Sequence, residues 1–140
     1  MTHSLTEVPP SAGKAVNVFG EVSVTDDPLA EIPNMSSKLI SQPQGINVQP
    51  SLQQPALLIT LSLAFITKEF NSSSLAYIGR NTYLENVSEL PVIGGSSAFR
   101  FARGYALAKT NSFNTSSGNA VAEYNVYVMH YQFSLTVFKW

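Results

Sequence analysis

One segment of the chain places an arginine among aromatic residues at strand spacing. Five residues at alternate positions would share one face of a β-strand: Phe99, Phe101, Arg103, Tyr105 and Leu107. A guanidinium in an aromatic-lined cavity can hold a phenolate or a quinone-like oxygen through hydrogen bonds and stacking. A second interpretation is structural, because Arg103 can pair across the sheet with a carboxylate such as Glu123. The residues alone leave both interpretations open.

Two carboxylates, Asp26 and Asp27, stand side by side directly before Pro28. Neighbouring residues on a strand point to opposite faces, so both acids can serve one site only if the strand ends there. An aspartate before a proline commonly starts a turn and hydrogen-bonds its own backbone. The pair therefore indicates a turn, with a functional role for one of the two acids as the alternative.

Residue counts exclude several kinds of chemistry. The chain has no cysteine, which removes thiol nucleophiles, thiolate metal sites and disulfides. Its two histidines are His3 and His130, so we expect no metal site, and we expect no cofactor. A Ser-His-acid triad would have to use His130, but the chain has no nucleophile elbow, and a strand histidine is the simpler interpretation. Gly94 and Gly95 lack the spacing of a phosphate-binding loop and predict a tight turn.

Composition bounds the size of the fold and the kind of partner. A chain of 140 residues with 44% hydrophobic content is one domain with one core. Only 12% of its residues are charged and the net charge is −1, so we expect neither nucleic acid nor membrane as a partner. The apolar run 55–67 is shorter than the ~20 residues that span a bilayer. Uncharged aromatic ligands fit this composition better.

Four Asn-x-Ser/Thr sequons favour secretion and are candidate glycosylation sites. They are centred on Asn34, Asn71, Asn86 and Asn114. Residues 1–14 lack the apolar core of a signal peptide, which was therefore either removed or never encoded.

Hydrophobic residues alternate with a period of two wherever the chain is apolar, which predicts an all-β fold. The clearest core strand runs over 57–65, and a hairpin follows at 71–78. Residues 28–55 contain several prolines and predict loops, with a short edge strand near 46–49. Turn residues recur at intervals of roughly ten residues, which is typical of a β-sandwich or a closed β-barrel. The pattern alone does not distinguish these two architectures.

Six segments in order resemble the dirigent proteins of plants. They read VSVTDDPL (22–29), SSKLI with QG (36–40, 44–45), NSSSL (71–75), GRN (79–81), GGSSAFRFARGYA (94–106) and EYNVYV (123–128). The resemblance covers residues from about Phe19 to Tyr131. It implies an eight-stranded antiparallel β-barrel, similar to allene oxide cyclase and lipocalin barrels, that assembles into a homodimer or homotrimer.

The resemblance also implies a function in the apoplast. Lignan-directing members have no oxidising centre of their own, so the resemblance favours a stereo-directing auxiliary protein over an enzyme and leaves enzyme activity open. They orient two phenoxy radicals, made from a monolignol such as coniferyl alcohol by a separate laccase or peroxidase, so that one enantiomer of a lignan forms. Arg103, in the Ala-Arg-Gly motif, is the position carried over from the family.

Four departures from the family are visible. Nothing before Gly20 matches the usual first strand with its His-Asp pair, so we expect a barrel lacking that strand. We expect residues 1–18 to be poorly ordered, 19–131 to form the barrel, and 132–140 to be an atypical extension. Ala98 stands where lignan-directing members commonly carry an acid, and the absence of cysteine places the chain outside the disulfide-containing, lignan-directing subgroup.

The leading hypothesis is a secreted stereo-directing protein in lignan biosynthesis. Arg103 would bind a ligand oxygen, and Phe101 and Tyr105 would shape the cavity. The alternative is a dehydratase similar to pterocarpan synthases, acting on an isoflavanol with Asp27 as the candidate acid. A third hypothesis is a non-catalytic, defence-associated binding protein.

Overall fold

The structure is a computed structural model that describes residues 2–5, 19–31, 37–82, 84–113 and 120–131. In this part of the chain the secondary structure consists of β-strands and one short 3-10 helix. In chain order these are β1 (Thr2–Leu5), β2 (Val22–Asp26), β3 (Leu29–Ala30), β4 (Leu39–Val48), β5 (Leu57–Phe65), β6 (Ser74–Asn81), β7 (Ser88–Ser96), η1 (Ser97–Phe99), β8 (Arg103–Phe113) and β9 (Ala120–Met129).

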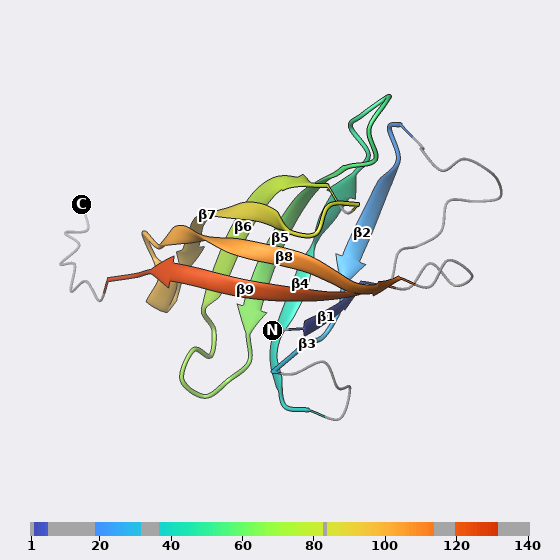
Figure 1. The fold of residues 1–140 in the computed structure, drawn as a ribbon. Helices are drawn as coiled ribbons and strands as arrows, with labels where there is room; N and C mark the ends of the chain where they lie inside the picture. Colours follow the sequence, from blue (N-terminus) through green and yellow to red (C-terminus); the bar gives the residue numbers. More distant parts are fainter. Residues whose placement is uncertain (1, 6–18, 32–36, 83, 114–119, 132–140) are drawn as a thin grey trace.

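All strand pairs are antiparallel and form one curled sheet (Figure 1). From β3 the pairing runs in chain order through β4 to β9, then through β1 back to β3, a circuit of eight strands. β2 pairs with the rest of β4, beside β3. The predicted eight-stranded antiparallel barrel is therefore confirmed.

The N-terminal strand β1 stands where the sequence predicts a missing strand and a poorly ordered segment. Thr2 pairs with both Ala30 of β3 and Glu123 of β9, so this short strand bridges two neighbours. The backbone alone supplies these ladder bonds, which explains how a segment without the family's His-Asp pair can occupy the position. Residues 6–18 and the predicted extension 132–140 lie outside the described residues.

β4 is a central strand in a region for which the sequence predicts loops and a short edge strand. It pairs with β2 and β3 on one side and with β5 on the other, although it contains Pro43 and Gly45. The Pro43 carbonyl accepts a hydrogen bond from the Asp27 N–H at 3.1 Å, at the break between β2 and β3. Proline has no N–H to donate, and on this side of Pro43 the ladder is interrupted between β2 and β3. A proline is therefore tolerated at this position of β4.

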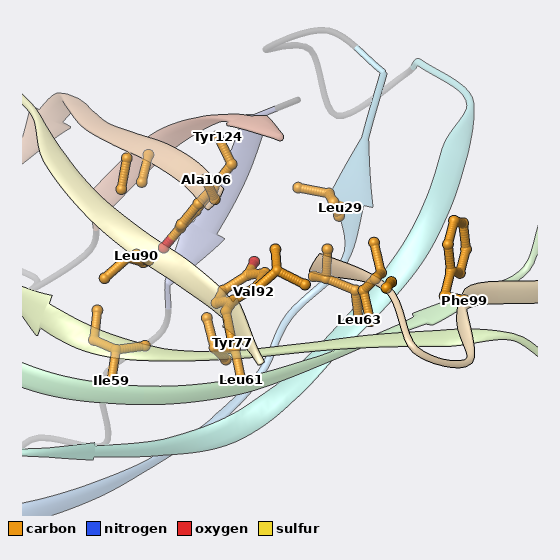
Figure 2. Packing of buried hydrophobic residues seen from close by; sticks show 14 of the residues in the cluster. Leu29, Ile59, Leu61, Leu63, Tyr77, Leu90, Val92, Phe99, Ala106 and Tyr124 are labelled. Atoms are coloured by element: carbon orange, nitrogen blue, oxygen red, sulfur yellow. The ribbon is translucent and has the colours of Figure 1, made fainter. Parts of the chain in front are cut away.

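Alternate residues of every long strand point into one interior. In Figure 2, Ile59 and Leu61 of β5 lie opposite Ala106 of β8 and Tyr124 of β9, with Tyr77 of β6 beside them. An aromatic cluster lies at one end of the barrel, where Phe65, Phe70 and Phe99 pack with ring centroids 5.1–5.9 Å apart. The interior beyond this cluster is where a ligand site must be sought.

Candidate functional site

The segment before β8 is not the uninterrupted strand that the sequence predicts from Phe99. Residues Ser97–Phe99 form the 3-10 turn η1, and Ser97 and Phe101 adopt positive φ angles of 52° and 63°. Because this turn breaks the alternation, Phe99 is buried at 3% exposure while Phe101 is 59% exposed. The prediction that these two side chains share a face is wrong.

Arg103 and Tyr105 point away from the interior as well. Arg103 is exposed, and its Nη1 donates hydrogen bonds to the carbonyl oxygens of Ile93 at 2.9 Å and Ala102 at 3.1 Å. The inner face of β8 instead carries the buried residues Ala106 and Ala108, and the buried Ala102 directly precedes the strand. Ligand binding by Arg103, Phe101 and Tyr105 stays a prediction, and it now concerns the outer surface of the barrel.

The two adjacent aspartates lie in opposite environments, as neighbouring residues of a strand should. Asp26 is exposed and accepts hydrogen bonds from Gln42 Nε2 at 2.8 Å and Gln44 Nε2 at 3.1 Å, which lower the pKa of its carboxyl group. Asp27 is 4% exposed and lies between β2 and β3. Among the described aspartate, glutamate, lysine and arginine residues, it is the one that is buried.

Two buried tyrosines lie next to this acid inside the barrel. Tyr77 of β6 and Tyr124 of β9 are 0% and 1% exposed, and their rings stack with centroids 6.2 Å apart. Burial raises the pKa of both phenols well above the usual value, and the nearby Asp27 raises that of Tyr124 further. Both tyrosines are therefore neutral hydrogen-bonding groups at physiological pH.

Buried polar atoms without a protein partner mark the same interior. The Tyr77 hydroxyl and Asn47 Oδ1 have no hydrogen-bond partner among the described residues. Asn47 is 2% exposed, and its Nδ2 donates to Thr25 Oγ1 at 2.8 Å. Since leaving such groups unpaired costs about 1–3 kcal/mol each, they indicate a place that a polar ligand or water completes.

The buried polar groups of the interior therefore include Asp27, Tyr77, Tyr124 and Asn47, of which sequence reasoning selected Asp27 as a candidate acid. Tyr77 and Tyr124 carry no sequence motif that separates a ligand contact from a packing role, because tyrosine suits both barrel walls and ligand contacts. Sequence reasoning missed Asn47 because residues 46–49 were predicted to form only a short edge strand. Asn47 stands two residues after Gly45 in β4, and alternate residues of a strand share one face, so the two positions lie on the same face of β4.

The remaining predicted sites lie on loops and strand ends. Asn71 and Asn86 are exposed in the β5–β6 and β6–β7 connections, while Asn34 and Asn114 lie outside the described residues. His130 follows β9 and packs against Phe99 with ring centroids 5.1 Å apart. Among the described residues, no group of histidine, aspartate and glutamate side chains could hold a metal ion, and no helix could cross a membrane.

The comparison with protein families matches this architecture. The family described as "Dirigent-like protein" matches residues 2–129, so the chain belongs to the dirigent family, as its motifs predict.

Relatives of known name fall into two groups. Dirigent protein 21 of Arabidopsis thaliana is 44% identical over 121 residues, which cover 86% of this chain and 64% of that protein. Pterocarpan synthase 1 of Glycyrrhiza echinata is 43% identical over 122 residues, covering 85% of this chain and 65% of that protein. The chain thus spans slightly less than two thirds of these relatives.

Two solved structures of pterocarpan synthase dirigent proteins share the fold. GePTS1 is 36% identical with a TM-score of 0.85, over 98% of this chain and 87% of that one. PsPTS1 is 38% identical with a TM-score of 0.83, over 94% of this chain and 92% of that one.

Proposed function

We propose that the barrel interior binds a phenolic small molecule and that Asp27 transfers protons to and from it in the dehydration of an isoflavanol. The observation that carries this proposal is the burial of Asp27 beside Tyr124, inside the barrel. A buried carboxyl group near a ligand is suited to general acid catalysis. The pterocarpan synthases among the relatives give this chemistry a precedent in the family.

The proposed reaction uses one carboxyl group in two directions. Protonated Asp27 donates its proton to the benzylic hydroxyl of the substrate, the C–O bond breaks, and water leaves. Loss of the phenolic proton to solvent gives a neutral quinone methide. A second phenolic oxygen of the same molecule then attacks the benzylic carbon and returns its proton to Asp27, while the first oxygen regains a proton from solvent. The net change is loss of one water.

The tyrosines and Asn47 would orient the substrate. Phenol hydroxyls that stay neutral can donate to or accept from substrate oxygens, and Asn47 Oδ1 can accept from a substrate hydroxyl. The apolar residues around them, including Leu90 and Val92, would cover the aromatic rings of the substrate and exclude water.

Stereo-directed radical coupling is the second candidate function. Several relatives bear the name dirigent protein, and the coupling needs only a shaped interior that favours one docking mode. A preference of about 2 kcal/mol between two docking modes gives roughly thirty-fold enantiomeric bias. The oxidant would be a separate laccase or peroxidase.

One assay separates the two candidates. Purified protein is incubated with an isoflavanol carrying a free phenol and no oxidant, and in parallel with coniferyl alcohol and a laccase, with chiral chromatography of both products. We expect cyclised pterocarpan from the first mixture. An unreacted isoflavanol together with an optically active lignan would overturn the dehydratase proposal in favour of coupling.

We propose that the chain acts outside the cell and is glycosylated. Asn71 and Asn86 are exposed in connections between strands, where an oligosaccharide can be attached without disturbing the sheet. Expression in plant cells with and without glycosidase treatment tests this directly, because a mass shift at either sequon is expected. A protein retained unmodified inside the cell would contradict the proposal.

We propose that the outer face of β2, β4, β5 and β6 associates with other copies of the chain, as a homodimer or homotrimer. Val24, Ile46, Thr60 and Ile78 lie opposite one another along one row. Val24 is 62% exposed and Ile46 47% exposed, and Val22 and Leu58 extend the apolar surface on the neighbouring row. Contiguous apolar surface of this kind is typical of subunit interfaces.

A further inference from the structure

Two tyrosines form a stacked, partly exposed aromatic pair on the outside of the barrel, on strands that do not pair with β2 or β4. Tyr105 of β8 and Tyr127 of β9 are cross-strand partners, and their rings stack with centroids 5.0 Å apart and planes 26° apart. They are 38% and 53% exposed. Met129, 65% exposed, continues the apolar surface toward the end of β9. We call Tyr105 and Tyr127 the tyrosine platform.

A hydrogen-bonded polar group continues the same face. Residues 123, 125 and 127 of β9 alternate to one side of the strand. The Glu123 carboxylate accepts hydrogen bonds from Asn125 Nδ2 at 3.1 Å and Asn111 Nδ2 at 3.3 Å, and these bonds lower the pKa of Glu123. The carboxylate is therefore ionised and held in place before any ligand arrives. It lies four residues, or about 13 Å, from Tyr127 along the strand.

This combination matches the chemistry of a sugar chain. The ring faces of a sugar are apolar and pack on aromatic rings, while its edges carry neighbouring hydroxyl groups. A carboxylate and carboxamides can accept from and donate to such hydroxyls at the same time.

The charged residues of this face form no cluster of one sign, which favours neither an anionic nor a cationic ligand. Lys109 lies opposite Glu123 in the β8–β9 register, and Arg103, at the other end of β8, donates hydrogen bonds to the backbone carbonyls of Ile93 and Ala102. A protein partner would more often meet an apolar centre with a polar rim, whereas here the aromatic and polar halves follow one another along the strands.

We propose that the outer face of β8 and β9 binds a neutral polysaccharide, with the tyrosine platform packing on sugar rings and the group of Glu123, Asn111 and Asn125 binding sugar hydroxyls. This site is independent of the barrel interior. It would hold the protein on a polysaccharide matrix while the interior remains open to small molecules.

Native affinity electrophoresis in gels containing hydroxyethyl cellulose tests the proposal. We expect the wild-type chain to be retarded, Tyr127→Ala to bind about tenfold more weakly, and Tyr127→Phe to retain binding, because the ring and not the hydroxyl makes the contact. Phe19→Ala is the matched control, since Phe19 is 57% exposed and lies in the turn before β2, a strand that does not pair with β8 or β9. It should bind like the wild type.

Two outcomes would overturn the proposal. One is a folded wild-type protein that migrates equally with and without the polysaccharide. The other is a Tyr127→Ala variant whose mass by size exclusion with light scattering falls to that of a smaller assembly, because the platform would then be a subunit interface. Turnover of the small-molecule substrate should be unchanged in Tyr127→Ala, which separates this test from that of the interior site.

Discussion

Asp26 and Asp27 provide a test of catalysis within one dipeptide. Replacing the buried Asp27 by Asn should lower turnover of the isoflavanol by about 10²-fold or more, because the amide keeps the shape but cannot donate a proton. Asp26→Asn is the matched control, since Asp26 is exposed and bonded to Gln42 and Gln44. Rates are measured with both variants folded by circular dichroism. Equal losses in the two variants would argue against a catalytic role for Asp27.

Tyr77 links stability to ligand binding. Its hydroxyl is buried and unpaired among the described residues, so Tyr77→Phe should raise the free energy of unfolding by about 1 kcal/mol while weakening binding of a phenolic ligand. Denaturant unfolding and a ligand titration measure the two effects. Tyr127→Phe, at a tyrosine that is 53% exposed, should change neither. A destabilised Tyr77→Phe would mean that the hydroxyl has a partner in the free protein.

At the scale of the element, the η1 turn decides which aromatic side chains enter the core. Phe99→Ala should cost about 3 kcal/mol of unfolding free energy, because Phe99 contacts Phe65, Phe70 and His130. Phe101→Ala, two residues away and 59% exposed, should change it by about 0.5 kcal/mol or less. Thermal unfolding of both variants checks this, and equal effects would mean that the alternation continues through the turn.

β4 is a central strand although its residues predict a loop. Pro43 and Gly45 favoured the loop prediction, yet the neighbouring strands accommodate each of them. Pro43 faces the break between β2 and β3, and at Gly45 a Cβ atom would lie only 1.9 Å from the Thr60 carbonyl oxygen. The strand therefore depends on glycine for the close approach of β5.

At the scale of the whole molecule, the apolar outer face should govern assembly. Ile46→Lys should convert an oligomer to a monomer, because a buried lysine charge at the centre of the interface is costly. Leu84→Lys, also at an exposed apolar position but in the β6–β7 connection, should leave the mass unchanged. Size exclusion with light scattering measures both. A wild-type chain that is monomeric at all concentrations would contradict the proposed assembly.

The sequence by itself determined the family, the all-β class and the main core strand, because these depend on local motifs and on a period-two pattern that survives in β5 with little interruption. It also indicated that the chain turns at Asp26 and Asp27, but the burial of Asp27 next to the exposed Asp26 follows from how β2 ends against β4.

Only the tertiary structure decided which side of β8 faces inward. Positive φ at Ser97 and Phe101 reverses the alternation, and no local pattern announces it, so Arg103 and Tyr105 lie outside while alanines line the interior. It likewise brought Asp27, Tyr77 and Tyr124 together. These residues are separated by tens of positions in the chain. They come together because the antiparallel strand pairing closes into a circuit, and such closure depends on pairing between strands far apart in the sequence.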